Sequence, residues 1–251
     1  MTAFSYQLYS SRNFPPLGDT LTMLAGLGYA QVEGYGALVA DPDAVAALEV
    51  GLKDAGLEMP TSHVGLDMIQ SDPASVAQIA KRLGMRTAIV PYIMPDVRPT
   101  DAAGWSAYGA GLESAAKALA AHGVGLGYHN HDFEYAALAD GSLPIDHLLR
   151  NAPSVVYEFD VAWAVRAGAD PMDTVAQHGS RILSVHLKDI AAPGENEDED
   201  GWADVGHGTM DWAALFAAFK AAGTQYFVAE HDNPSDHQRF ARRALASAQS
   251  F

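Results

Sequence analysis

Residues 155–189 read VVYEFDVAWAVRAGADPMDTVAQHGSRILSVHLKD, and this stretch contains one complete strand–helix–strand unit. An apolar run at 155–161 is followed by a helical pattern at 172–178, and Gly179 then precedes a second apolar run at 182–188. Short β-rich runs predict buried strands, and a glycine directly after a helical segment is typical of a helix C-cap. The stretch therefore predicts two strands of one sheet that are joined by a helix.

The same alternation extends along the rest of the chain. The expected strands are 4–9, 30–33, 59–64, 87–92, 124–129, 155–161, 182–188 and 226–230, and the expected helices include 41–55, 73–83, 102–121, 145–150, 172–178, 212–221 and 236–248. Units of about 30 residues fit roughly eight times into this length, which suits one α/β barrel. A doubly wound sheet normally has fewer strands, and no Gly-rich phosphate-binding turn is present. We predict an α/β fold, a single (β/α)8 TIM barrel formed by residues 1–251 as one domain.

Composition and charge exclude several classes of protein. Hydrophobic residues make up 49% and charged residues 18%, which is typical of a globular chain. The formal net charge of −16 disfavours a nucleic-acid partner, because phosphates would be repelled. Cysteine is absent, so any bound metal must use oxygen and imidazole ligands. No apolar stretch could span a bilayer, and the first residues do not look like a signal peptide, so we expect a cytoplasmic protein with no membrane partner.

Ionisable side chains recur where the expected strands end. They are Glu33, His63, His129, His131, Glu134, Glu158, Asp160, His186, Lys188, Asp189, Glu230, His231 and Asp232. Because the carboxyl ends of barrel strands converge on one face, these groups should gather in one pocket. Buried imidazoles and carboxylates need a partner for their charge, and a divalent cation is one such partner. The mixed donor set suits manganese, zinc, cobalt or iron better than calcium.

Structural interpretations stay open for some of these features. Asp189, His231 and Asp232 can also act as caps of the helices that follow them. The acidic loop at 191–209 is expected to be solvated, although a mobile lid over the barrel mouth is the alternative. Three tryptophans can form an apolar wall against a sugar face, and core packing is the stronger expectation for the second of them; they are Trp105, Trp163 and Trp202.

Five motifs carry a resemblance to a known family. They are YHNHDFE at 128–134, EFDVAW at 158–163, VHLKD at 185–189, VGHGTMDW at 205–212 and AEHD at 229–232. With these motifs the chain resembles the xylose-isomerase-like TIM barrel superfamily, the sugar phosphate isomerase/epimerase group, over nearly its whole length. The resemblance implies one divalent metal ion as cofactor, with manganese first and zinc, cobalt, iron or magnesium as alternatives. It also implies a small sugar or cyclitol as substrate and is compatible with a homo-oligomer.

The resemblance further implies which side chains hold the metal. Asp160, His186 and Glu230 match the family's ligands on strands six, seven and eight. Epimerases of the family carry a glutamate on strand five that is both ligand and base, whereas this chain has His129 there and His131 two residues later. We assign His129 as the fourth ligand and keep His131 as the alternative. This departure resembles the inosose-dehydratase-like and keto-glycoside-cleaving branches.

The implied activity is that of a metal-dependent isomerase or epimerase, which acts on a small keto/hydroxy sugar through an enediolate. Glu230 is the first choice of base, with Glu158 and His131 as further catalytic candidates. The expected substrate-binding residues are Glu33, His63, Lys188 and Glu134. The alternative is a metal-dependent lyase or dehydratase on a keto-inositol or 3-keto-glycoside. An endonuclease is disfavoured by the negative charge, and a sugar-binding barrel without activity is the remaining class.

Overall fold

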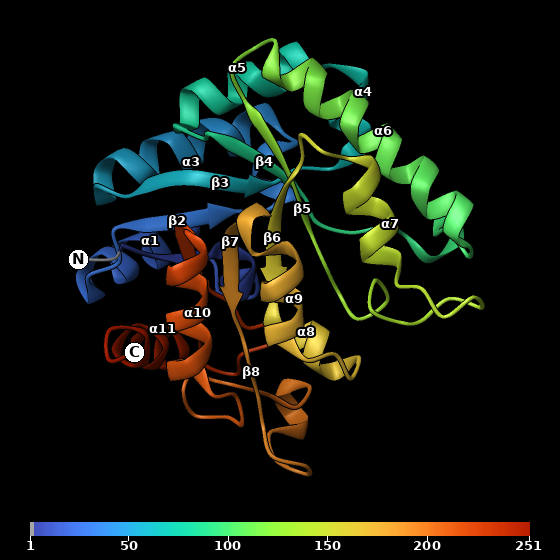
Figure 1. Ribbon diagram of the computed structural model, residues 1–251. Coiled ribbons are helices and arrows are strands. Elements are labelled where there is room, and N and C mark those ends of the chain that lie inside the picture. Colours follow the sequence, from blue (N-terminus) through green and yellow to red (C-terminus); the bar gives the residue numbers. More distant parts are fainter. Residues whose placement is uncertain (1–2) are drawn as a thin grey trace.

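The computed structural model describes residues 3–251. Its centre is a closed barrel of parallel strands in the order β1-β10-β7-β6-β5-β4-β3-β2 (Figure 1). These strands are β1 (Phe4–Gln7), β2 (Gln31–Gly34), β3 (Glu58–His63), β4 (Thr87–Val90), β5 (Gly125–His129), β6 (Val156–Asp160), β7 (Ile182–Leu187) and β10 (Tyr226–Ala229). Each strand overlaps one of the strands expected from the sequence, so the prediction of a (β/α)8 barrel is confirmed.

Helices cover the outside of the barrel (Figure 1). They are α1 (Leu17–Leu27), α2 (Gly36–Val39), α3 (Pro42–Ala55), α4 (Leu66–Ser71), α5 (Pro73–Leu83), α6 (Ala102–Ala120), α7 (Pro144–Asn151), α8 (Val161–Arg166), α9 (Pro171–His178), α10 (Trp212–Ala222) and α11 (His237–Ala248). The helices named from the sequence are all present, and α1, α2, α4 and α8 are additional. Within residues 3–251, no helix combines the length and the apolar character needed to cross a membrane.

Local sequence signals set the ends of the outer helices. Asp41, Asp72 and Asp101 each accept a hydrogen bond from a backbone N–H in the first turn of α3, α5 and α6, respectively. Such caps satisfy N–H groups that have no partner within the helix. Gly56 and Gly84 end α3 and α5 with φ angles of 68° and 73°, a left-handed conformation that glycine adopts without steric cost.

Successive side chains on the strands alternate between the barrel interior and the outer layer. In β6, Phe159 joins the hydrophobic core, while Glu158 and Asp160 on either side of it contact His186 inside the barrel. Because both faces of the strands are buried, the strands appear as apolar runs in the sequence. The polar positions at their carboxyl ends are the exception, and they form the site described below.

The acidic loop at 191–209 is attached to the C-terminal helix through a buried carboxylate. Glu199 lies in the 3-10 helix η4 (Glu197–Glu199), and its carboxylate accepts hydrogen bonds from Arg239 at 2.8 and 2.9 Å and from the Ser235 N–H at 2.7 Å. The expectation of a solvated loop is therefore wrong for Glu199, because Arg239 from α11 compensates its charge.

Asp189 organises the same connection. It belongs to β8 (Asp189–Ile190), which pairs antiparallel with β9 (Trp202–Ala203) outside the barrel. Its buried carboxylate accepts the N–H groups of Gly206 at 2.9 Å and Gly208 at 3.2 Å and the Trp212 indole N–H at 3.0 Å. Asp189 thus holds a returning loop in place and does not cap the next helix.

Candidate metal centre

Imidazoles and carboxylates from five strands meet inside the carboxyl end of the barrel. Glu33 comes from β2, His63 from β3, His129 from β5, Glu158 and Asp160 from β6, and His186 from β7, while Lys188 and Glu230 follow directly after β7 and β10. All of these side chains are buried. Strand pairing sets their neighbourhood, since His129 is the register partner of Glu158 and Asp160 that of His186. The convergence expected from strand-end positions is therefore present.

His186 lies at the centre of the cluster, with a carboxylate against each ring nitrogen. Its Nδ1 is 2.7 Å from Glu230 Oε2 and 3.9 Å from Asp160 Oδ2. Its Nε2 is 2.7 Å from Glu33 Oε1 and 3.1 Å from Glu158 Oε1. Burial alone would lower the pKa of His186, but Glu158 and Glu230 outweigh it and raise that pKa well above its ordinary value.

The first group with metal-ligand geometry is His129, Asp160, His186 and Glu230, whose ligand atoms all lie within 4.8 Å of one another. Asp160 Oδ1 accepts the Trp163 N–H at 2.9 Å, whereas Asp160 Oδ2 is buried without a hydrogen-bond partner. Burial raises the pKa of Asp160 to about 7. An unpartnered carboxylate oxygen beside two imidazoles and a second carboxylate fits a divalent transition metal.

Lys188 is the buried cation beside this group. Its Nζ lies 2.6 Å from Asp232 Oδ2, 3.3 Å from Glu230 Oε2 and 3.5 Å from Asp160 Oδ2. Burial would raise the pKa of Glu230, but Lys188 and His186 outweigh it and hold that pKa well below its ordinary value. Glu230 is therefore ionised at neutral pH.

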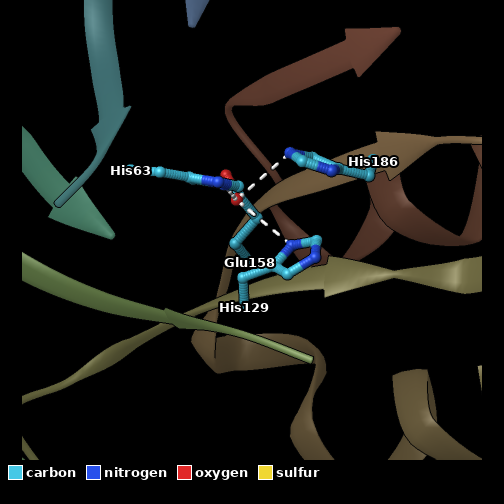
Figure 2. Close-up of side chains that lie close together, drawn as sticks. All are labelled: His63, His129, Glu158 and His186. Atoms are coloured by element: carbon cyan, nitrogen blue, oxygen red, sulfur yellow. Dashed lines mark hydrogen bonds and ion pairs between the residues drawn. The ribbon is translucent and has the colours of Figure 1, made fainter. Parts of the chain in front are cut away.

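The second group with metal-ligand geometry is His63, His129, Glu158 and His186 (Figure 2). Three imidazoles approach one carboxylate oxygen, Glu158 Oε1, at 2.7 Å from His63 Nε2, 3.1 Å from His186 Nε2 and 3.4 Å from His129 Nδ1. The other oxygen, Glu158 Oε2, accepts the Ser184 hydroxyl at 2.5 Å. Glu158 was expected only as a catalytic candidate, and the structure places it among potential ligands.

Two polar side chains outside the predicted site residues, Gln7 and Asn130, hydrogen-bond to this cluster. Gln7 Nε2 donates to Glu33 Oε1 at 2.8 Å. Asn130 Oδ1 accepts the Asp160 N–H at 2.9 Å, and Asn130 Nδ2 donates to the Asp160 carbonyl at 3.1 Å. Asn130 lies within the YHNHDFE motif, so the sequence does contain a signal for it. Gln7 is the last residue of β1, and no motif in the sequence marks that strand.

Two predicted residues of the strand-five motif lie outside both ligand groups. Glu134 is fully buried and accepts hydrogen bonds from the Tyr128 hydroxyl and from the His131 N–H at 2.8 Å. These contacts favour a structural role, and substrate binding by Glu134 stays a prediction. His131 lines the cavity, with its ring stacked on Phe133 at 5.7 Å and its Nδ1 unpartnered. Burial lowers the pKa of His131 well below its ordinary value, so this imidazole is neutral at pH 7.

A cavity of about 420 Å³ opens above the cluster. His63, His129, His131 and Glu230 line its polar part. Aromatic side chains form its walls, namely Tyr9, Tyr35, Tyr92 and Trp163. Among residues 3–251, none of those that line this cavity is a lysine or an arginine.

One of the three tryptophans that were expected to form an apolar wall lines the cavity, and the other two are buried. Trp163 faces the cavity, and its ring packs edge-on against Trp202 with centroids 4.8 Å apart. Trp105 and Trp202 are each only 1% exposed and belong to the interior. The expectation of core packing for Trp163 was therefore wrong, because the turn from β6 into α8 brings this side chain to the mouth of the barrel.

Comparison with solved structures shows which proteins share the fold. A sugar phosphate isomerase/epimerase from Parabacteroides distasonis superposes with a TM-score of 0.82 at 19% identity, covering 99% of this chain and 94% of that one. A probable 3-DHS dehydratase from Bacillus anthracis, involved in petrobactin synthesis, superposes with a TM-score of 0.77 at 13% identity, covering 99% of both chains. These TM-scores establish a shared fold.

Sequence comparison gives one partial relative and one family match. The rhizopine catabolism protein MocC of Rhizobium meliloti is 32% identical over 87 residues, which is 34% of this chain. The match spans about a quarter, 26%, of that protein's length. The family model described as xylose isomerase-like TIM barrel matches residues 22–250. The chain belongs to the xylose isomerase-like TIM barrel family.

Proposed function

We propose that the chain is a divalent-metal-dependent isomerase or epimerase that transfers a proton beside the carbonyl of a small keto/hydroxy sugar. The observation that carries the proposal is the convergence of Asp160, His186 and Glu230 below one cavity, with Asp160 Oδ2 lacking a hydrogen-bond partner. His129 is the proposed fourth ligand. When bound there, a divalent cation supplies Lewis-acid polarisation of substrate oxygens, for which manganese is our first choice.

Glu230 is the proposed base. Its carboxylate is ionised and lines the cavity, so it can accept a proton from a sugar carbon placed there. Lys188 holds Glu230 Oε2 at 3.3 Å, and it thereby fixes the direction of the carboxylate. Glu158 lies deeper, and His63 and Glu33 complete the polar floor as proposed substrate-binding and positioning groups.

The cavity favours an unphosphorylated sugar. Tyr9, Tyr35, Tyr92 and Trp163 offer apolar faces of the kind that pack against sugar C–H groups, and within the described part of the chain no lysine or arginine lines the cavity to bind a phosphate.

A lyase acting on a keto-inositol or 3-keto-glycoside is the second candidate. His131 supports it, because this neutral imidazole lines the cavity with Nδ1 free of hydrogen bonds; it can take the proton from the carbon next to the carbonyl as a base and then, as imidazolium, give it to the leaving hydroxyl or alkoxide. Fold similarity to a dehydratase makes this reaction class a reasonable comparison.

Solvent exchange tests the proposal and separates the two reactions. The manganese-loaded protein is incubated in D2O with ketoses, inososes and 3-keto-glucosides, and deuterium on the carbon next to the carbonyl is followed by NMR. An isomerase or epimerase exchanges this proton and interconverts two sugars, whereas a lyase releases water or aglycone and forms an absorbing enone.

Matched variants locate the base in this experiment. Glu230→Gln should slow exchange by about 10²–10⁴-fold, the range for loss of a general base. Glu195→Gln in the exposed part of the 191–209 loop should exchange at the wild-type rate. No exchange with any of these sugars by the metal-loaded wild type would contradict the proposed function.

A further inference from the structure

We propose that the barrel holds a second divalent transition-metal ion, bound deeper than the first by His63, His129 and Glu158, with Glu33 beside it. We name this group the inner site, and we name Asp160, His186 and Glu230 the outer site. The inference goes beyond the proposed function, which needs only the outer site with His129 as its fourth ligand; when both ions are bound, His129 completes the inner shell and the outer ion keeps Asp160, His186 and Glu230.

The hydrogen-bonding capacity of the inner groups is the first argument. A neutral imidazole has one N–H, and a carboxylate oxygen has two lone pairs. Three imidazole nitrogens lie around the single atom Glu158 Oε1; His63 Nε2 bonds to it, His186 Nε2 has Glu33 Oε1 at 2.7 Å, and His129 Nδ1 is left over. His129 Nδ1 and Glu33 Oε2 are in fact buried without a hydrogen-bond partner. Buried polar atoms without partners are rare in folded proteins, and an ion is one explanation.

The donor atoms lie close to the spacing of a ligand shell. Donor atoms bound about 2.1 Å from one ion lie roughly 3–3.4 Å apart. Glu158 Oε1 lies 3.4 Å from His129 Nδ1, within this range, and His63 Nε2 lies 3.6 Å from Glu33 Oε1, just beyond it. The 2.7 Å between Glu158 Oε1 and His63 Nε2 is a hydrogen-bond distance, which would lengthen when an ion binds between the two atoms. The three rings and the carboxylate point toward one another from different strands (Figure 2).

The two ring nitrogens of His186 face different carboxylates, one pair in the outer site and one pair in the inner site. Nδ1 faces Glu230 and Asp160, whereas Nε2 faces Glu33 and Glu158. His186 can therefore serve the outer ion through Nδ1 while the inner carboxylates lie beyond its opposite edge. His129 approaches Glu158 to 3.4 Å, so it can complete the inner shell when both ions are bound.

Charge gives an independent argument. Lys188 Nζ lies within 3.5 Å of the outer carboxylates of Asp160 and Glu230, and it also contacts Asp232. The inner carboxylates of Glu33 and Glu158 have no lysine or arginine partner among residues 3–251, and imidazoles are their ionisable neighbours of opposite charge. Two buried carboxylates are balanced by one divalent cation.

Donor chemistry indicates which ion each site takes. The inner site is rich in imidazole nitrogen, which suits zinc, cobalt or iron, whereas the outer site with two carboxylates also suits manganese. We therefore use zinc as the probe for the inner site.

Metal stoichiometry tests the inference. The full chain is stripped with a chelator, reloaded with zinc chloride, exchanged into metal-free buffer and analysed by mass spectrometry. Wild type should retain about two equivalents, and His63→Ala and Glu158→Gln about one each. His122→Ala, which removes an exposed histidine, should retain the wild-type amount. Circular dichroism of each variant checks that it is folded.

Anomalous diffraction at the zinc edge gives the positions, and it needs only wild-type protein. One peak should lie between Asp160 and Glu230 and a second between His63 and Glu158. A single peak at the outer site, or His63→Ala with undiminished zinc, would overturn the inference. A peak at the inner site without one at the outer site would support the inference and count against the proposed function.

Discussion

Asp160 and His186 are register partners on the neighbouring strands β6 and β7, and Asp160 Oδ2 lies 3.9 Å from His186 Nδ1. This separation leaves space for an ion that both atoms can bind, because neither is in hydrogen-bond contact with the other. Asn130 fixes Asp160 through both backbone groups, and Trp163 N–H fixes its second oxygen. The pair is therefore held in position before any ion binds, which favours tight binding.

Replacing Trp163 tests the aromatic wall of the cavity. Trp163→Ala should raise KM about 3–10-fold with a smaller change in kcat, because an aromatic contact contributes about 0.5–1.5 kcal/mol to binding. Trp163→Phe should restore most of the affinity, since it keeps an aromatic face and the backbone N–H that Asp160 accepts. Steady-state kinetics with the sugar identified by deuterium exchange measures this, and an unchanged KM in Trp163→Ala would show that the ring does not touch substrate.

Glu199→Gln tests the anchor of the 191–209 loop. Burial opposes ionisation, but hydrogen bonds from Ser235 and Arg239 outweigh it and lower the pKa of Glu199 to about 2. A carboxylate whose pKa is depressed on folding stabilises the protein above its unfolded value near 4.3, and this contribution is lost as pH falls toward the folded value. We expect Glu199→Gln to lower the free energy of unfolding by about 1–3 kcal/mol at pH 7.

Denaturant unfolding of wild type and Glu199→Gln at pH 7 and at pH 3 checks the direction of this pH dependence. The difference between wild type and Glu199→Gln should shrink at pH 3, a value between the two pKa values. Glu195→Gln, in the exposed part of the same loop, should change stability by less than about 0.5 kcal/mol. A Glu199→Gln difference that grows as the solution is acidified would contradict the assignment.

Asp189→Ala tests the loop that returns to α10. The substitution leaves the N–H groups of Gly206, Gly208 and the Trp212 indole without their acceptor. We expect a loss of about 3 kcal/mol, because the buried Trp212 indole N–H and two partly buried backbone N–H groups lose one charged acceptor. Asp211→Ala removes one exposed helix cap and should cost only about 1 kcal/mol. Equal losses in the two variants would show that Asp189 is not the organising group.

The strands and most helices could be predicted because burial and helix capping leave local patterns in the sequence. The convergence of Asp160, His186 and Glu230 followed from the fold, since barrel strands carry their carboxyl ends to one face. The pairing of parallel strands determines contacts that local sequence patterns do not encode. Glu158, for example, is the register partner of His129 and contacts His63.

Contacts between distant elements explain the residues that sequence reasoning misjudged. Glu199 is buried because Arg239, far along the chain, meets it, and Gln7 matters because β1 lies beside β2 and Glu33. Trp163 faces the cavity because α8 begins immediately after Asp160. None of these relationships leaves a periodic or compositional signal in the sequence.

The most direct measurement is manganese-edge anomalous diffraction on crystals of the wild type and of Asp160→Asn after soaking in manganese chloride. In the wild type we expect a peak about 2.0–2.3 Å from Asp160 Oδ2, His186 Nδ1 and a Glu230 oxygen. In Asp160→Asn this peak should be strongly reduced, whereas Asp211→Asn should keep it. No peak at this position in the wild type, or a peak of full height in Asp160→Asn, would contradict the account.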